Sequence, residues 1–247
     1  MNRMSSASSR LKDIYSDLSR AVSGLSFALP VTHVYNPLEY AWPSVSAYLD
    51  RAASGPTRAM FLGMNPGPWG MAQTGVPFGT VSLVRDWMGI EEDVGKPDRE
   101  HPKRPVLGFA CEREEVSGAR FWGWAKDRYQ TADCFFEHFF VANFCPLVFM
   151  EESGRNRTPD KLPASERQGL FALCDQALAD IVDVLDPEHV IGVGKFAEDR
   201  ARAVLSGREI RIGRILHPSP ASPVANRGWQ AQAEKQLGDQ GVAAVRI

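Results

Sequence analysis

Several features that would place this chain in a specialised class are missing from its sequence. Only four of its 247 residues are cysteine, no two of them form a Cys-x-x-Cys pair, and none stands beside a histidine at metal-ligand spacing. A zinc site or an iron–sulfur cluster is therefore not expected, and the cysteines are interpreted as buried free thiols of a reducing compartment. No apolar run approaches the roughly 20 residues that a membrane span requires. The polar, Ser-rich opening lacks the apolar core of a secretory signal, so we expect a cytoplasmic protein, associated with the nucleoid if it is bacterial.

Charge of one sign is also scarce. The formal net charge is −2 and the charged fraction is 23%, values typical of an ordinary globular protein. The charges are nevertheless uneven, because residues 86–115 have an acidic excess and residues 188–235 a basic one. A local basic groove would suffice to bind nucleic acid, since phosphate contacts depend on where the cations lie. Two differently solvated faces are the alternative interpretation.

A phosphate-binding loop of the nucleotide triphosphatases is absent as well. The Gly- and Pro-rich run at residues 63–70 is not followed by Gly-Lys-Ser or Gly-Lys-Thr. The later Gly-Val-Gly-Lys at residues 192–195 lacks the hydroxyl residue and the upstream spacing. Nucleotide triphosphate hydrolysis is therefore not expected.

Short apolar runs alternate with helical patterns along the chain. Buried strands are predicted at residues 59–63, 139–143, 189–193 and 213–217. Helices are predicted near residues 11–22, 37–53 with a kink at Pro43, 164–185 and 196–205. This alternation favours an α/β fold with a parallel sheet covered on both faces. We expect one domain over residues 1–247, with residues 1–10 disordered and residues 89–117 mostly loop.

Three of the predicted strands end in a polar residue near a proline. Asn65 and His217 each stand directly before a proline, and Asn143 stands three residues before Pro146. Proline biases its predecessor away from helical backbone, so each strand should open into a loop there. Ligands of open α/β sheets bind outside the carboxyl ends of the strands. The two asparagines and the histidine are therefore candidate active-site residues.

Two long runs carry a resemblance to a known family. The run GMNPGPWGMAQTGVPFG at residues 63–79 and the run HPSPASPVANRGW at residues 217–229 resemble the two motifs of the single-strand-selective monofunctional uracil-DNA glycosylases. The intervening runs VSGARFWG, NFCPL and SGRN are also similar to that family. The resemblance spans about residues 30–240. It implies a three-layer α/β/α sandwich around a short, mainly parallel sheet. It also implies a cofactor-free enzyme that hydrolyses the N-glycosidic bond of uracil, and of 5-hydroxymethyluracil, in DNA to leave an abasic site.

The same resemblance implies roles for individual residues. Asn65 would position the attacking water, and His217 would donate a hydrogen bond to O2 of the departing base. The amide of Asn143 would accept from N3–H and donate to O4 of uracil, a pattern that cytosine reverses. Phe78 would stack on the flipped base. The implied substrate-binding set is Gly63, Met64, Gly67, Met71, Phe78 and Asn143.

The segment that follows His217 is expected to enter DNA. The implied DNA-binding residues are Pro218, Ser219, Pro220, Ala221, Asn226 and Arg227. Vertebrate members carry an arginine four residues after the histidine, where this chain has Ala221. Efficient action on duplex DNA is thereby in doubt, or the task shifts to neighbours such as Arg227. We expect a monomer that acts on single-stranded and also on double-stranded DNA.

Less specific interpretations remain open. Asn65 alone could stabilise a turn, His217 could be a structural hydrogen-bonding residue, and Phe78 could belong to the core. A relative specialised for deaminated purines such as xanthine or hypoxanthine would share the scaffold. A non-catalytic module that binds damaged DNA is a third possibility, although it would have no need for a water-positioning group.

Overall fold

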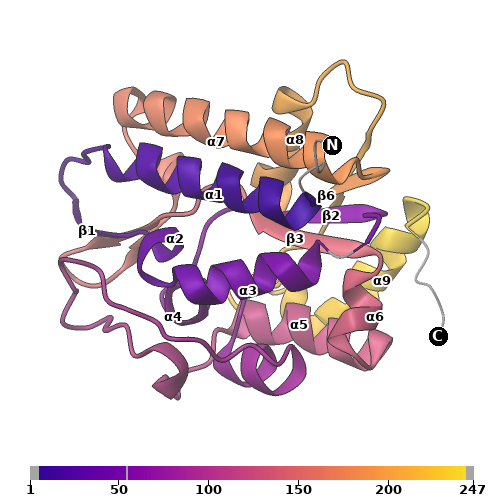
Figure 1. Cartoon of the computed structure of the whole chain (residues 1–247), viewed down its shortest axis with the longest axis horizontal. Coiled ribbons are helices and arrows are strands. Elements are labelled where there is room, and N and C mark those ends of the chain that lie inside the picture. Colours follow the sequence, from indigo (N-terminus) through magenta and orange to yellow (C-terminus); the bar gives the residue numbers. More distant parts are fainter. Residues whose placement is uncertain (1–5, 54, 243–247) are drawn as a thin grey trace, which may run out of the picture.

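The computed structural model describes residues 6–53 and 55–242, and its centre is a four-stranded sheet (Figure 1). The strands are all parallel, in the order β3 (Phe139–Asn143), β2 (Ala59–Gly63), β6 (His189–Val193) and β7 (Arg211–Ile215). Every residue of β2 and β6 is buried. Continuous burial explains why these strands are apolar except for His189, the first residue of β6, since a parallel sheet is covered on both faces.

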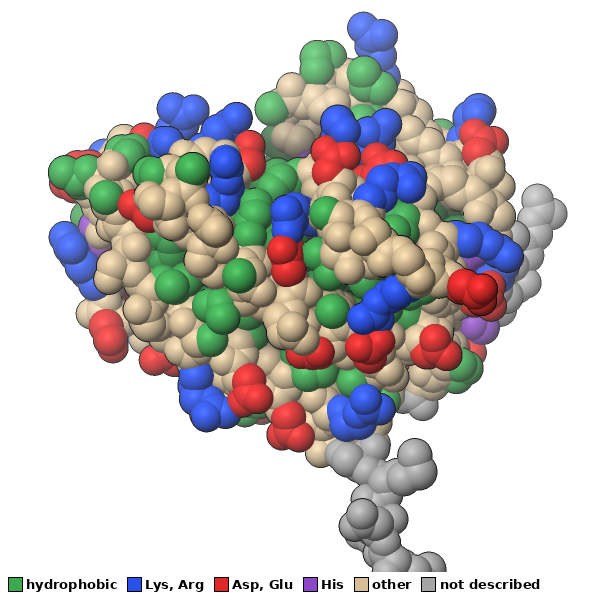
Figure 2. Space-filling model, turned by 90° about the horizontal axis from the view of Figure 1, so that it is seen from above, with side chains coloured by type: hydrophobic (Ala, Val, Ile, Leu, Met, Phe, Trp, Pro, Cys, Tyr) green, Lys and Arg blue, Asp and Glu red, His purple; other side chains and the backbone are tan. Residues whose placement is uncertain are grey.

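Helices cover the two faces of this sheet. One layer contains α1 (Ala7–Ser23), α7 (Ala164–Leu185) and α8 (Lys195–Val204), uppermost in Figure 1. The other contains α5 (Val116–Tyr129), α6 (Ala132–Phe136) and α9 (Trp229–Asp239), in the lower part of the same view. The predicted three-layer α/β/α sandwich with a parallel central sheet is confirmed. Seen from above, the layer of α7 and α8 carries acidic and basic side chains interspersed with one another (Figure 2).

A second sheet was not predicted from the sequence. It is antiparallel, in the order β1 (Val31–Tyr35), β4 (Val148–Glu151) and β5 (Asn156–Arg157). Burial alternates along β1. Each of these strands is five residues or shorter. The pairing of β1 with β4 joins residues 113 to 120 positions apart, from Tyr35 with Val148 to Val31 with Glu151, whereas β4 and β5 are neighbours in the chain. Local periodicity carries little information about such a sheet.

Helix and strand boundaries differ from expectation in a few places. The helix predicted at residues 37–53 is two helices, α2 (Pro37–Tyr40) and α3 (Trp42–Ala52), separated at Ala41. Pro43 lies in the first turn of α3, where its missing N–H costs no hydrogen bond. Strand β7 ends at Ile215, two residues earlier than predicted. Short helical segments complete the chain: α4 (Met71–Thr74), η1 (Leu83–Trp87), η2 (Gly108–Ala110), η3 (Pro159–Lys161) and η4 (Ala225–Arg227).

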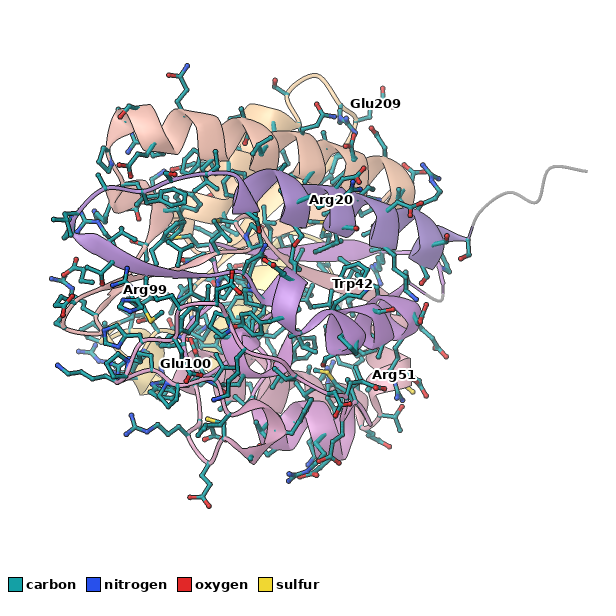
Figure 3. The ribbon with its side chains drawn as sticks, turned by 60° about the vertical axis from the view of Figure 1, so that its left-hand side comes forward. Arg20, Trp42, Arg51, Arg99, Glu100 and Glu209 are labelled. Atoms are coloured by element: carbon teal, nitrogen blue, oxygen red, sulfur yellow. The ribbon has the colours of Figure 1, made fainter. Side chains whose placement is uncertain are left out.

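The prediction of disorder for residues 1–10 is wrong in its second half. Helix α1 begins at Ala7, and the Ser6 hydroxyl accepts a hydrogen bond from the Ser9 amide as an N-cap. Residues 1–5 lie outside the described residues. The side chains of Arg20 on α1 and Arg51 on α3 are labelled in Figure 3, where these two helices lie side by side. None of the helices in the described residues is long and apolar enough to cross a membrane.

The strand order places a topological switch point between β2 and β6. From β2 the chain leads through α5 to the outer neighbour β3, and from β3 it returns through α7 to β6 on the other side of β2. It then continues through α8 to β7. The chain therefore leaves the carboxyl ends of β2 and β6 toward opposite faces of the sheet. Open α/β sheets bind their ligands at such a crevice.

Candidate active site

Gly63 and Asn143 are paired neighbours at the carboxyl ends of β2 and β3. The ladder continues beyond both strands, because the amides of Phe144 and Cys145 donate to the carbonyls of Gly63 and Met64 at 2.9 Å each. The first residues of both loops are thus fixed by the backbone. This rigidity brings two of the sequence-predicted residues to one edge of the sheet.

Asn65 follows β2 by two residues. Its side-chain Nδ2 donates to the carbonyl oxygens of Pro66 at 3.2 Å and Leu147 at 3.1 Å. Leu147 belongs to the loop after β3, so Asn65 also ties the two loops together. With both N–H groups occupied, the orientation of the amide is set and Oδ1 is the atom left to accept a hydrogen bond.

Asn143, Phe78 and Gly63 pack in close contact. A Cβ on Gly63 would overlap Asn143 Oδ1 and lie 2.6 Å from Phe78 Cε2, so only glycine fits beside these two side chains. Asn143 Nδ2 donates to Met71 Sδ at 3.4 Å. The predicted base-recognition group Asn143, the predicted stacking ring of Phe78 and Met71 of the predicted substrate-binding set therefore form one cluster.

The backbone of Phe78 adopts a left-handed conformation, with φ of 56°. A bulky residue rarely adopts this conformation unless its surroundings impose it. Here α5 does so: the ring stacks on Phe121 with centroids 5.1 Å apart, and the Phe78 carbonyl oxygen fills the place of a Cβ on Gly118. The neighbouring Pro77 carbonyl accepts from Trp122 Nε1 at 2.9 Å. The motif around Gly118 thus positions the ring of Phe78.

His217 lies two residues beyond β7. Its predecessor, Leu216, is held by Gln236, which accepts from its amide at 2.7 Å, and by Trp229, which donates to its carbonyl at 2.6 Å. Burial lowers the pKa of His217 below its ordinary value. Its ring centroid lies 6.4 Å from that of Phe78, and a Cβ on Gly194, the residue after β6, would lie 3.2 Å from His217 Cβ. Burial therefore favours the neutral imidazole of His217, which is seated between Phe78 and the end of β6.

Gly67 contacts an acidic residue that the sequence analysis did not single out. A Cβ on Gly67 would overlap the carboxylate oxygens of Glu115. Trp69 N–H donates to Glu115 Oε2 at 3.3 Å. Burial raises the pKa of the Glu115 carboxyl, opposed by the hydrogen bonds from the amides of Trp69 and Gly70. The glycine at position 67 is thereby explained by packing against Glu115 as well as by any approach to a ligand.

The predicted residues are linked by pairwise contacts, but they do not all contact one another directly. Asn143, Phe78 and His217 follow one another through ring and side-chain contacts, and Asn65 joins the set through Leu147. Within the part of the chain that the structure describes, no hydrogen bond connects Asn65 with His217. Behind the set lies a small apolar cavity lined in part by Met60, Leu62, Met71, Asn143 and Pro146.

The predicted DNA-binding segment is a compact loop fastened by α5. Arg120 donates to the carbonyls of Pro218 at 3.2 Å and Ser219 at 3.4 Å, and to Asn226 Oδ1 at 2.8 Å. Asn226 in turn donates to the Pro220 carbonyl at 2.9 Å. Asn226 therefore holds the loop in shape. Pro220, Ala221, Val224 and Arg227 are exposed on it, and Val224 retains 49% of its accessible surface.

Residues that hold backbone segments in place were missed by the sequence reasoning. Arg120 stands within the VSGARFWG run and Glu115 directly precedes it. Gln73, in the first motif, is fully buried, donates to the carbonyls of Pro68 and Pro105, and accepts from the Leu107 amide. Their positions inside or beside the quoted motifs were the available signal. Among residues 6–53 and 55–242, no group of three or more His, Cys, Asp or Glu side chains gathers as metal ligands would.

Comparison with known proteins gives consistent matches. Residues 52–237 match the family model of the uracil DNA glycosylase superfamily. Single-strand selective monofunctional uracil-DNA glycosylases of Rattus norvegicus, Mus musculus and Bos taurus are 51%, 50% and 51% identical to this chain. These alignments cover 91%, 91% and 88% of this chain and 82%, 81% and 81% of the relatives. The crystal structure of Pedobacter heparinus SMUG2 superposes with a TM-score of 0.72 over 97% of this chain and 98% of its own. At 16% identity, that likeness concerns the fold alone.

Proposed function

The chain belongs to the single-strand-selective monofunctional family of the uracil-DNA glycosylase superfamily, and from this membership we propose that it hydrolyses the N-glycosidic bond of uracil in DNA. The product is an abasic site, which initiates base-excision repair. The observation that carries the proposal is the cluster of Gly63, Phe78 and Asn143 at the carboxyl ends of β2 and β3. Gly63 and Phe78 stand in the family's first motif, and Asn143 opens the run NFCPL.

The base is recognised by Asn143 and Phe78. The Asn143 amide presents an acceptor for N3–H and a donor for O4, and its neighbours Gly63 and Met71 restrict its rotation. A cytosine in the same place would present a hydrogen-bond donor to the donor of the Asn143 amide, and this mismatch would leave polar groups unpaired. Phe78 offers a ring face whose other side is already covered by Phe121. 5-Hydroxymethyluracil is a second substrate, with Gly67 and Met71 on the C5 side of the base.

Catalysis is divided between Asn65 and His217. The Asn65 amide is too weak a base to remove a proton early, but its fixed Oδ1 can orient a water toward the anomeric carbon. As the bond breaks, negative charge develops on the departing uracil. A neutral His217 donates its single N–H to O2 of that anion, and a preorganised donor of this kind contributes about 3–4 kcal/mol to lowering the barrier.

The enzyme is monofunctional. Neither the run at residues 63–79 nor the run at residues 217–229 contains a lysine that could attack the sugar as a nucleophile. Water is the acceptor, and the DNA backbone stays intact. Single-stranded DNA is the preferred form, because the loop fastened by Arg120 presents Ala221 and Val224 in place of a long cationic wedge.

The proposal is tested with oligonucleotides that contain uracil, 5-hydroxymethyluracil or xanthine, followed by alkaline cleavage of abasic sites. Strand scission is expected for the first two. Scission with xanthine alone would favour the deaminated-purine alternative, and none on any substrate would reject the proposed activity. Asn65→Ala is expected to lose about 10²–10³-fold in turnover while binding is retained. Unchanged turnover would reject the role of Asn65.

A further inference from the structure

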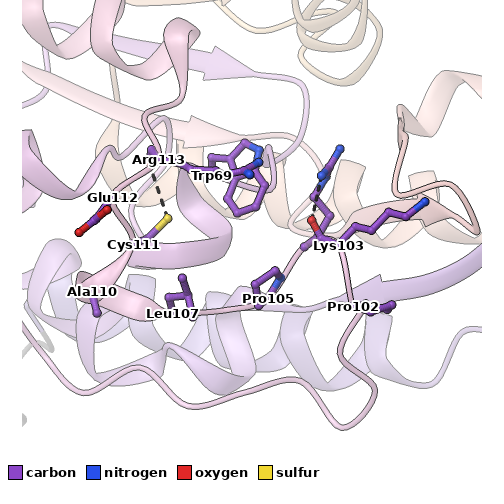
Figure 4. Close-up of a pocket in the computed structure, with 10 residues that line it drawn as sticks. Trp69, Pro102, Lys103, Pro105, Leu107, Ala110, Cys111, Glu112 and Arg113 are labelled. Atoms are coloured by element: carbon purple, nitrogen blue, oxygen red, sulfur yellow. Dashed lines mark hydrogen bonds between the residues drawn. The ribbon is translucent and has the colours of Figure 1, made fainter.

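A hollow of about 660 Å³ adjoins the catalytic loop (Figure 4). One wall is Trp69, four residues after Asn65 in the same loop, and the remainder is formed by residues 102–105, 107 and 110–113. The hollow is distinct from the set formed by Asn65, Phe78, Asn143 and His217, because none of those four lines it.

The hollow contains cations without carboxylate partners. Lys103, Arg104 and Arg113 line it, and none of them takes part in an ion pair with a described residue. The guanidinium carbons of Arg104 and Arg113 lie 5.3 Å and 4.5 Å from the centroid of the Trp69 ring. Arg104 Nε is buried and makes no hydrogen bond within the described residues. The one acidic side chain of the lining is Glu112.

The distribution of charge along the sequence would place a basic surface at residues 188–235 and not at the hollow. The basic excess at residues 188–235 is largely neutralised in the fold, since six of its cations form ion pairs: Lys195, Arg200, Arg202, Arg208, Arg214 and Lys235. Lys103, Arg104 and Arg113, which form no ion pair with a described residue, lie instead within the acid-rich residues 86–115. Arg120 is also occupied, by the loop after His217.

Hydrogen bonds hold the hollow rigidly against the loop that contains Asn65 and Trp69. Tyr35 Oη accepts from the His101 amide at 2.6 Å and donates to the Arg104 carbonyl at 2.8 Å. Glu100, labelled in Figure 3, accepts from the Val106 amide at 2.8 Å. Gln73 joins this segment to the catalytic loop by bonding the carbonyls of Pro68 at 2.8 Å and Pro105 at 3.0 Å. Its buried side chain fixes the distance between the cations and Asn65.

We propose that Trp69, Arg104 and Arg113 form a clamp for backbone phosphates of the DNA strand beside the excised nucleotide. The inference rests on the proposed function. Trp69 orders the two guanidinium groups by cation–π contact. Arg104 Nη1 donates to the Lys103 carbonyl at 2.8 Å, and among the described residues the Arg113 guanidinium makes no hydrogen bond, so its N–H donors remain for a ligand. Phosphate matches such donors in charge and geometry, and each contact is a charge-assisted hydrogen bond. The clamp does not discriminate between DNA sequences, because contacts to phosphate contain no information about the bases.

The test uses single-stranded oligonucleotides with one uracil and a single neutral methylphosphonate linkage moved stepwise along the strand. In the wild-type protein, one or two positions are expected to raise KM roughly tenfold through the lost charge-assisted contact. In Arg113→Ala and in Arg104→Ala, a neutral linkage at the phosphate that the removed arginine would contact should have no further effect, because that contact is already lost. Both variants should raise KM on the unmodified strand with kcat unchanged. Their plots of log KM against log salt concentration should flatten by about 0.7 per lost contact.

The matched control is Arg202→Ala, which removes an exposed arginine whose Nη2 bonds the Ile212 carbonyl near the start of β7, away from the carboxyl edge. It should behave as the wild type does. Suppose that the wild type releases uracil, but Arg104→Ala and Arg113→Ala respond to each methylphosphonate position and to salt concentration as the wild type does. The proposed clamp is then wrong, and the proposed function stands. If the wild type releases no uracil from any strand, the proposed function itself fails.

Discussion

Gly63 and Asn143 occupy adjacent register positions at the ends of β2 and β3, and the Asn143 side chain fills the space that a Cβ on Gly63 would need. Gly63→Ala is therefore expected to displace Asn143 Oδ1 and the Phe78 ring, the two groups that we propose contact the base. Uracil excision should fall at least about tenfold in kcat/KM, since small displacements of positioned groups are costly.

Gly169→Ala is the matched control for that experiment. Gly169 lies inside α7, nothing comes within 4 Å of a Cβ there, and alanine is the better helix former. The control should keep full activity and gain stability. Equal activity of Gly63→Ala and Gly169→Ala in single-turnover assays would contradict the packing argument.

His217 is expected to act as a neutral donor, because burial lowers its pKa. His217→Ala should slow the chemical step by about 10²–10³-fold. His217→Gln, which keeps a neutral N–H donor, should retain more activity than the alanine variant. The single-turnover rate of the wild type should stay level as the pH falls through the ordinary range of a histidine. A drop or rise centred on that range, absent from His217→Gln, would mean that the imidazole titrates normally.

Glu115 should make the stability of the fold depend on pH. Burial raises its pKa, so in acid the folded and unfolded states both bind the proton, and on raising the pH the unfolded state releases it first. The free energy of unfolding should therefore fall as pH rises from the ordinary carboxyl pKa through the raised one. In Glu115→Gln this fall should be missing. Urea unfolding at a series of pH values measures it, with Glu92→Gln, an exposed loop residue, as the control. Parallel curves for the wild type and Glu115→Gln would contradict the prediction.

Ala221 should limit action on duplex DNA. It is exposed on the loop that Arg120 fastens, so an arginine there would extend from a rigid base. Ala221→Arg is expected to improve excision from duplex DNA more than from single strands, since only the duplex requires base extrusion. Ala203→Arg adds the same charge to an exposed position of α8 and controls for general attraction to DNA. An equal gain on both forms of DNA would count against extrusion as the cause.

Much of the fold follows from the sequence because three of the four parallel strands, β2, β3 and β6, are buried along almost their whole length, whereas the edge strand β7 is mostly half-buried or exposed. Their apolar runs are short, bounded and separated by helical patterns, and β2, β3 and β6 begin and end where periodicity places them. The strands β1, β4 and β5 carry no comparable signal, since β1 alternates between buried and half-buried residues and β4 and β5 are only four and two residues long. The helix at residues 37–53 was predicted as one helix with a kink at Pro43, whereas the structure divides it at Ala41 and places Pro43 in the first turn of α3.

The residues of the candidate site also fall into those that the sequence predicts and those that it does not. Residues that would touch the substrate, such as Asn65, Phe78 and Asn143, stand in motifs at strand ends and were named from the sequence. Gln73 and Arg120 were not, because they act on carbonyl oxygens of distant segments. Which carbonyl lies within reach is a property of tertiary packing, and no local pattern encodes it.

The left-handed backbone of Phe78 brings two opposing energies together at one position. A non-glycine residue in that region costs of the order of 1–3 kcal/mol. Glycine would remove that strain, but it would also remove a ring that stacks on Phe121 with centroids 5.1 Å apart, and losing a packed phenyl ring costs about 3–5 kcal/mol. Packing therefore outweighs strain at this residue, so selection for thermostability alone should keep an aromatic side chain there, and with it the ring proposed to stack on the base.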